Sequence, residues 1–226
     1  MNLLAIDTST KNFSIAILRD AEVLVSENTI LEKILSDSII PSIQRILKKA
    51  KLGLADIDGF AVGLGPGSFT SLRVGLATIK GLAFSLDKPV VGIPSPDAIA
   101  MNIREDHPKV CVISDARRNL VYASWYEKKG GRLKPKSDYK LTSITDLLQG
   151  EKGEIVFIGD AIQLFKKEIA KFKLKPIFID EKLWYPKAQN LGLLALPRFQ
   201  KGKVDEVDTL VPLYLYPEDC QVQNKG

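Results

Sequence analysis

The strongest constraint on the fold is a pattern of predicted elements that occurs twice along the chain. In each half a buried apolar strand ends in an aspartate, Asp7 in the first and Asp115 in the second, and a polar turn and another strand follow. Further elements complete the order β-β-β-α-β-α in both halves. The pattern predicts a duplicated α/β fold whose subdomains, residues 1–103 and 108–226, face a cleft. Chance similarity between common strand–turn–strand patterns is the alternative.

Two long amphipathic helices are predicted in the first half. One pattern covers residues 30–47, where apolar side chains recur at helical spacing, and Pro41 is expected to bend this helix without ending it. The second pattern covers residues 69–86. Further along, the tail after about residue 210 has no clear periodicity, and it could pack on either subdomain.

The composition is ordinary for a soluble globular chain, with 45% apolar and 26% charged side chains among 226 residues. The formal charge of +5 and a pI near 9.0 predict a mildly basic surface. That charge suits solubility, and it is also compatible with an acidic partner such as a nucleic acid. Two cysteines make no disulfide framework and the N-terminal stretch has no signal-peptide pattern, so a cytoplasmic protein is expected.

The stretch GLGPGSFTSLR, residues 63–73, leads into the second helix through three glycines and a proline. A phosphate-binding loop is one interpretation, but the stretch has no lysine where a P-loop requires one, and Pro66 lacks a backbone donor. A rigid corner is the alternative, in which Gly65 and Gly67 supply unusual backbone angles and Pro66 stiffens them. We expect this corner to set the direction of the helix.

One face of the second helix is formed by residues at spacings of three and four, most of them small. They are Ser71, Gly75, Thr78 and Leu82. Small side chains let another helix approach closely, so this face is a candidate partner interface, and tight packing within the chain is the alternative. Arg73 is a candidate for a bidentate pair with a partner carboxylate. A bulky stripe is expected to face the sheet: Leu72, Leu76, Ile79, Ala83 and Leu86.

Five sequence blocks carry a resemblance to a known family: AIDTST, GPGSFTSLRVGLATIKGLA, DARRNLVY, YPKAQNLGLLAL and LVPLYLYP. They resemble the blocks of the TsaB (YeaZ) family, which is part of the actin, sugar kinase and Hsp70 superfamily. The blocks occur in family order over nearly the whole chain, and the second is the most specific. One position departs from the family pattern, because Leu35 precedes Ser36 where a histidine is expected.

The resemblance implies an actin-like (ASKHA, ribonuclease H-like) fold and an accessory role. It implies a non-catalytic partner of TsaD in the bacterial tRNA threonylcarbamoyladenosine synthase, which modifies the adenosine beside the anticodon and includes the ATPase TsaE. The implied interface pairs the helices of residues 30–47 and 69–86 with those of TsaD in a four-helix bundle. Contact with tRNA is then indirect, through the complex, and a homodimer is expected when TsaD is absent.

Features of the enzymatic superfamily are only partly present. Asp7 stands where actin-like enzymes place the carboxylate that positions magnesium-bound water, so it is a weak candidate for nucleotide binding. In the second half Arg117 and Arg118 stand where those enzymes have a glycine-rich phosphate turn, and Asp160 follows Gly159 where a second glycine is usual. We expect no catalytic residue, metal ion or firm cofactor, and we expect Asp7 to cap a turn. Weak nucleotide binding in the cleft stays open.

Other activities are weighed on the same residues. A zinc peptidase needs two histidines on one helix face, and this chain has only His107, expected to be a solvated linker residue. Two rivals to an accessory subunit remain, a small actin-like ATPase or kinase acting alone and a module that binds tRNA directly. Calorimetry with ATP and magnesium tests the first, and salt-dependent tRNA affinity without TsaD tests the second.

Overall fold

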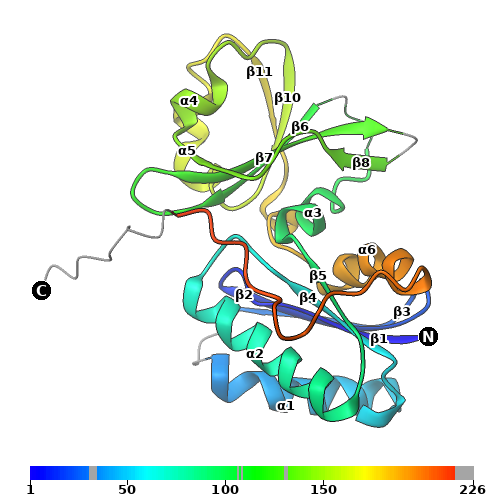
Figure 1. The fold of residues 1–226 in the computed structure, drawn as a ribbon. Helices are drawn as coiled ribbons and strands as arrows, with labels where there is room; N and C mark the ends of the chain where they lie inside the picture. Colours follow the sequence, from blue (N-terminus) through cyan, green and yellow to red (C-terminus); the bar gives the residue numbers. More distant parts are fainter. Residues whose placement is uncertain (31–34, 106, 108, 130–131, 217–226) are drawn as a thin grey trace, which may run out of the picture.

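Two lobes make up the molecule, and each is built on one mixed β-sheet (Figure 1). The computed structural model describes residues 1–30, 35–105, 107, 109–129 and 132–216. The first sheet has the strand order β3-β2-β1-β4-β5. Its strands are β1 (Asn2–Asp7), β2 (Asn12–Arg19), β3 (Glu22–Ile30), β4 (Gly59–Gly63) and β5 (Val90–Ile93).

Five strands of the second sheet repeat this topology, and a sixth is additional. Its order is β11-β10-β6-β7-β8, and β9 also pairs with β7. In the first sheet β1 is antiparallel to β2 and parallel to β4, which is parallel to β5. In the second sheet β6 is antiparallel to β7 and parallel to β10, which is parallel to β11. The predicted duplicated actin-like α/β fold is therefore confirmed. The strands are β6 (Lys109–Asp115), β7 (Val121–Lys129), β8 (Arg132–Pro135), β9 (Lys140–Thr142), β10 (Glu154–Ile158) and β11 (Lys175–Phe178).

Helices cover both faces of the first sheet (Figure 1). On one face lie α1 (Leu35–Ala50) and α2 (Phe69–Leu86), and α6 (Ala188–Gln200) covers the other. In the second lobe α4 (Ile144–Leu148) and α5 (Ile162–Ile169) cover one face of the sheet, and α3 (Ser95–Ala100) lies between the lobes. The described ranges also include the 3-10 helices η1 (Leu54–Asp56) and η2 (Glu181–Leu183).

The central strands form because they are apolar on both faces. In β1, Leu4 and Ile6 contribute to the core beneath α1 and α2, whereas Leu3 and Ala5 contribute to the core beneath α6. Alternate side chains of a strand point to opposite faces, so a continuous apolar run is needed where both faces are covered. No helix in the described ranges is both long and apolar enough to cross a bilayer.

The first helix begins later than the sequence pattern predicts. Ile30 is the last residue of β3 and pairs with Asn12 of β2, so strand pairing takes this residue. Residues 31–34 lie outside the described ranges, and α1 begins at Leu35. Pro41 lies inside α1 and does not end it, as predicted, and α1 continues to Ala50, beyond the predicted end at Leu47.

The chain returns to the first lobe after it has built the second sheet. Leu191 and Ala195 of α6 are buried in the core with Leu3 and Ala5 of β1, although α6 falls within the predicted second subdomain, 108–226. The predicted boundary therefore separates the two sheets but not the two lobes. The apolar stripe of α6 could cover any buried sheet face, and only packing between distant residues decides which sheet it covers.

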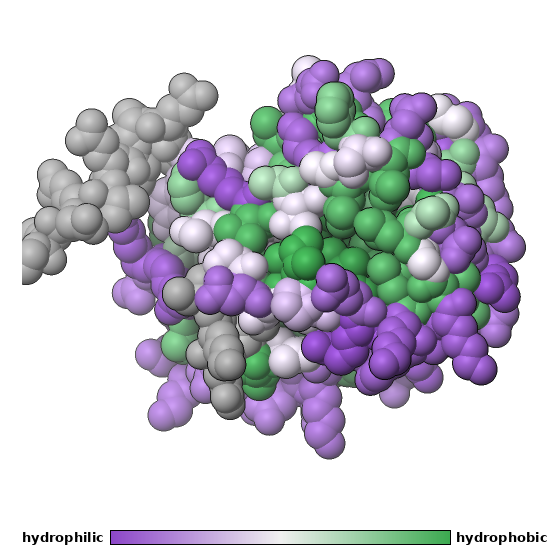
Figure 2. All heavy atoms as spheres, turned by 90° about the horizontal axis from the view of Figure 1, so that it is seen from below, coloured by the Kyte–Doolittle hydropathy of each residue, from purple (hydrophilic) through white to green (hydrophobic). Residues whose placement is uncertain are grey.

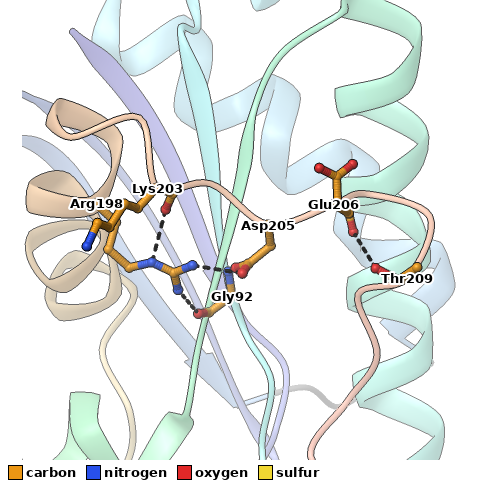
Figure 3. A network of polar contacts seen from close by, with 6 residues as sticks. All are labelled: Gly92, Arg198, Lys203, Asp205, Glu206 and Thr209. Carbon is orange, nitrogen blue, oxygen red and sulfur yellow. Dashed lines mark hydrogen bonds and ion pairs between the residues drawn. The ribbon is translucent and has the colours of Figure 1, made fainter.

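The segment after α6, residues 203–216, runs along the first lobe, and we call it the C-terminal strap (Figure 1). Its start is fixed by Arg198, whose guanidinium donates to the Lys203 carbonyl at 3.1 Å, the Gly92 carbonyl at 3.2 Å and the Asp205 carboxylate at 2.7 Å (Figure 3). Asp205 also accepts a hydrogen bond from the Gly92 amide at 2.8 Å. The strap is thereby held against the edge of the first sheet at β5.

Candidate functional site

The turn between β4 and α2 is in direct contact with the loop that follows β1. Gly65 has a φ of +83°, a left-handed angle that favours glycine, and a cis peptide bond joins it to Pro66. A Cβ atom at Gly67 would lie 2.8 Å from the Ser9 carbonyl carbon, and the Ser68 amide donates to the Ser9 carbonyl oxygen at 2.8 Å. These contacts fix the place at which α2 begins.

Asp7 lies fully buried at the end of β1, beside this turn. Its Oδ1 accepts from the Ser9 amide at 2.9 Å and the Ser9 hydroxyl at 2.6 Å, and its Oδ2 accepts from the Ser95 hydroxyl at 2.6 Å. Burial raises the pKa of the Asp7 carboxyl, and the hydrogen bonds from Ser9 and Ser95 oppose that rise. The Ser95 oxygen also accepts from the Gly65 amide, so Asp7 links the β1 loop, the turn and α3.

Asp115 holds the corresponding position at the end of β6, in a different arrangement. It accepts from the Arg117 amide at 2.8 Å and pairs with the Arg117 guanidinium at 3.3 Å. Arg117, Arg118 and Asn119 have φ values of +66°, +52° and +58°, so three consecutive non-glycine residues are left-handed. Asp160 accepts from the Asp115 amide at 3.0 Å, and burial raises the pKa of Asp160. Arg117 and Asp160 of the second lobe therefore both contact Asp115 at the start of this turn.

The described ranges contain no cluster of three or more His, Cys, Asp or Glu side chains that could hold a metal ion. The expectation that His107 is solvated is wrong, because its side chain is 12% exposed and its Nε2 lies 3.4 Å from the Glu105 carboxylate. Asp106 lies outside the described ranges. A cavity of about 300 Å³ lies beside α5 and β11 in the second lobe, where its lining includes Phe178 and Trp184.

The inward side of α2 is the bulky stripe that the helical spacing predicts. Its buried members are Leu72, Leu76, Ile79 and Ala83. Gly75 also lies on this side, because it is three residues after Leu72 and four before Ile79. A Cβ atom at Gly75 would lie 2.8 Å from Thr8 Cγ2 and would overlap Thr8 Oγ1. The structure thus corrects the predicted small-residue face: Gly75 makes an internal contact and is buried.

The other residues of that predicted face reach the surface in part. Ser71, Thr78 and Leu82 are half-buried along the side of α2, and Leu82 packs against the core that α1 and α2 share. The Thr78 hydroxyl donates to the Val74 carbonyl at 2.8 Å, which is a bond within the helix. Ser71, Thr78 and Leu82 therefore lie between the buried stripe and the exposed side.

Large apolar side chains on the outer side of the two helices were missed from the sequence. Phe84 of α2 is 80% exposed and Ile40 of α1 is 44% exposed. Figure 2 shows apolar residues gathered on this side of the first lobe, with polar residues around them. We call the exposed side chains of Ile40 and Phe84 the α1–α2 face. Phe84 could have been found from its spacing, since Ala77, Gly81 and Phe84 share the side opposite the buried stripe.

Arg73 lies at the N-terminal end of the exposed side of α2, and two aromatic rings hold its side chain. The guanidinium carbon is 3.7 Å from the centre of the Phe69 ring and 5.7 Å from the centre of the Tyr214 ring. Its Nε donates to the Tyr214 hydroxyl at 2.9 Å. A guanidinium that stacks on aromatic faces keeps its planar fork in one orientation. Arg73 therefore presents an ordered positive charge at the surface.

Two lobes whose sheets share a five-strand topology, each with an aspartate at the end of its first strand, define a duplicated actin-like α/β protein. The family model described as TsaD: tRNA N6-adenosine threonylcarbamoyltransferase matches residues 29–223. The chain belongs to the TsaB (YeaZ) family, as its relatives show. The TsaB protein of Bacillus subtilis is 31% identical over 219 residues, which are 95% of this chain and 94% of that protein. The TsaB protein of Escherichia coli is 28% identical over 221 residues, with the same coverage of 95% and 94%.

Solved structures agree with this assignment. YeaZ from Pseudomonas aeruginosa superimposes with a TM-score of 0.79 at 26% identity, over 95% of this chain and 99% of that one. A second Pseudomonas aeruginosa protein, described as similar to peptidase YeaZ, gives a TM-score of 0.82 at 25% identity with the same coverage. The curated relatives are named tRNA threonylcarbamoyladenosine biosynthesis proteins, so the resemblance drawn from the sequence is confirmed.

Proposed function

We propose that this chain is a non-catalytic subunit of the bacterial tRNA threonylcarbamoyladenosine synthase that binds and activates TsaD. The observation that carries the proposal is the exposed apolar α1–α2 face, together with the ordered Arg73 on the same side of α2 as Phe84. An apolar area framed by polar residues favours a protein partner. The match to the TsaD family model supports a partner of the same fold, because related chains can offer helix pairs of similar shape.

Docking would place α1 and α2 against two helices of TsaD. Ile40 and Phe84 would supply apolar contact area, and the small side chains of Ser71 and Thr78, on another side of α2, would let a second partner helix approach closely. Arg73 would pair with a carboxylate of TsaD through its planar fork. Gly75 would act from beneath, since its contact with Thr8 sets how deeply α2 sits on the lobe.

Activation would follow from the docking without chemistry on this chain. A subunit that binds the active conformation of TsaD more tightly than its other conformations raises the population of the active one. TsaE and tRNA would then meet this chain only within the complex. The modification itself, on the adenosine beside the anticodon, would take place on TsaD.

The environment of Asp7 supports an accessory role over the rival of a small ATPase or kinase. A carboxylate that positions magnesium-bound water must face that water, whereas both Asp7 oxygens accept hydrogen bonds from Ser9 and Ser95 and the side chain is fully buried. In the second lobe Arg117 pairs with Asp115. Calorimetry with ATP and magnesium tests the rival, because micromolar binding with turnover by the isolated chain contradicts the accessory role.

Charge substitution at the α1–α2 face tests the docking. Phe84→Asp and Ile40→Asp place carboxylates where the partner helices would close, so each variant should lose at least tenfold in affinity for TsaD. Leu164→Asp is the matched control, because Leu164 is 61% exposed on α5 of the second lobe. The measurements are copurification with TsaD and tRNA modification in a reconstituted assay. Wild-type copurification of Phe84→Asp, with its circular dichroism unchanged, contradicts the proposed face.

A further inference from the structure

The C-terminal strap contacts the first lobe along its length before it reaches the second. After the Arg198 anchor, Val207 and Leu210 pack against the core beneath α1 and α2. The Lys80 ammonium group of α2 donates to the carbonyl of Asp208 at 3.0 Å and to that of Leu210 at 3.2 Å. The strap thus follows one side of α2, from the C-terminal half of the helix toward its N-terminus.

The strap then joins the beginning of α2. The Leu213 amide donates to the Leu64 carbonyl at 2.8 Å, in the turn that precedes the helix. Tyr214 lies 5.4 Å from Phe69, ring centre to ring centre, and its hydroxyl accepts from Arg73. The orientation of Arg73 in the proposed docking surface therefore depends on a residue of the strap.

Two residues further on, the strap reaches the second lobe. The Tyr216 hydroxyl donates to the Ala116 carbonyl at 2.7 Å, and the Tyr216 ring meets the Tyr122 ring edge to face with 6.2 Å between centres. Ala116 immediately precedes the left-handed residues of the β6–β7 turn, a conformation that is costly for non-glycine residues and needs support from its surroundings. Figure 1 shows the strap passing from the first lobe to the second at this place.

We infer that the strap is a tie that couples the docking surface of α2 to the β6–β7 turn of the second lobe. Tyr214 hydrogen-bonds to α2 and Tyr216 hydrogen-bonds to the turn, and one residue separates them. A partner that pairs with Arg73 immobilises Tyr214, and the short distance along the chain passes this restraint to Tyr216. This effect of a partner rests on the proposed docking, whereas the tie itself is a property of the isolated chain.

Hydrogen exchange of the isolated chain tests the tie. The reporters are the amides of Ala116 and Leu120, which close the turn by bonding to Leu120 and Arg117 carbonyls. Tyr216→Phe removes the hydroxyl and keeps the ring, so exchange at these amides should rise about fivefold, the effect of one net hydrogen bond. Tyr214→Ala should raise it as well.

The controls decide between a tie and a general loss of stability. Tyr185→Phe removes a hydroxyl outside the strap and should leave exchange in the turn unchanged, and in all three variants the amides of the buried stripe of α2 should keep their wild-type rates. Unchanged exchange at Ala116 and Leu120 in both strap variants overturns the inference. Equal acceleration across both lobes overturns it too, because that result shows global destabilisation.

Exchange in the presence of TsaD tests the coupling. Docking should slow exchange at Ala116 and Leu120 severalfold in the wild type and should not do so in Tyr214→Ala. If TsaD binds the wild type and leaves the turn unchanged, the coupling is wrong. If TsaD does not bind at all, the proposed docking is wrong, and the experiment on the isolated chain still decides whether the tie exists.

Discussion

Gly75 of α2 and Thr8 of the β1 loop touch so closely that no side-chain carbon fits between them. A Cβ atom at position 75 would lie 2.8 Å from Thr8 Cγ2 and 3.1 Å from Thr8 Cβ. Thr8 is itself buried, and the loop that carries it is joined to the turn before α2 through Ser9. The close contact therefore sets the distance between α2 and the sheet, which is the distance that positions the proposed docking surface.

Gly75→Ala should lower the free energy of unfolding by about 1–3 kcal/mol, because the added carbon overpacks a buried contact and neither neighbour can move freely. The matched control is Gly81→Ala on the same helix, where a Cβ atom would meet nothing within 4 Å. That change should stabilise the chain by about 0.5–1 kcal/mol through helix propensity. Urea denaturation measures both. Stabilisation by Gly75→Ala would show that position 75 is open.

The buried Asp7 should make stability depend on pH in a defined direction. Burial raises the pKa of Asp7 above its usual value of 3.8. The contribution of Asp7 to the free energy of unfolding is therefore fully present below pH 3.8, and it is lost as the pH rises through the folded-state pKa. Asp7→Asn removes this titration, and its amide can donate to Ser95 while its oxygen accepts from Ser9. Relative to Asp7→Asn, the wild type should lose stability as the pH rises from 3.5 toward neutrality, about the range in which carboxyl groups titrate. Parallel profiles of the urea midpoint would contradict a raised pKa.

Arg198 should hold the start of the strap. Arg198→Ala removes three hydrogen bonds from a charged donor and leaves the Asp205 carboxylate without its arginine partner. We expect a loss of about 1.5–3 kcal/mol in the free energy of unfolding and faster proteolysis within residues 203–216. Arg104→Ala, at an exposed arginine before the second lobe, is the control and should change neither measurement. Proteolysis at the wild-type rate would show that Arg198 does not anchor the strap.

The strands and the inward stripe of α2 were predictable because they depend on local spacing. Continuous apolar runs identify β1 and β4, and a spacing of three and four identifies Leu72, Leu76 and Ile79. Asp7 was correctly placed at a strand end, and its bond to the following Ser9 is the kind of local contact that a sequence suggests.

The remaining features depend on residues that are distant in the sequence. Ser95 bonds to Asp7 across 88 positions, and Tyr214 bonds to Arg73 across 141. No periodic pattern in the sequence indicates which lobe α6 covers or which path the strap takes. Gly75 was placed in an exposed face because small residues at helical spacing look alike in sequence, whether they admit a partner helix or, as here, the Thr8 loop.

In the absence of TsaD, the exposed α1–α2 face should drive self-association. Phe84 exposes 80% and Ile40 44% of their surfaces, and a second copy can offer the same residues across a two-fold axis. Sedimentation should show a dimer whose fraction grows with protein concentration. Phe84→Asp should shift the equilibrium toward monomer by at least tenfold, since two carboxylates would then face each other at the axis. Leu164→Asp should leave the dimer intact.

Addition of TsaD should replace the homodimer with a heterodimer, because both assemblies would use one surface. A homodimer that persists in Phe84→Asp, or that binds TsaD without dissociating, would place the self-contact on another face.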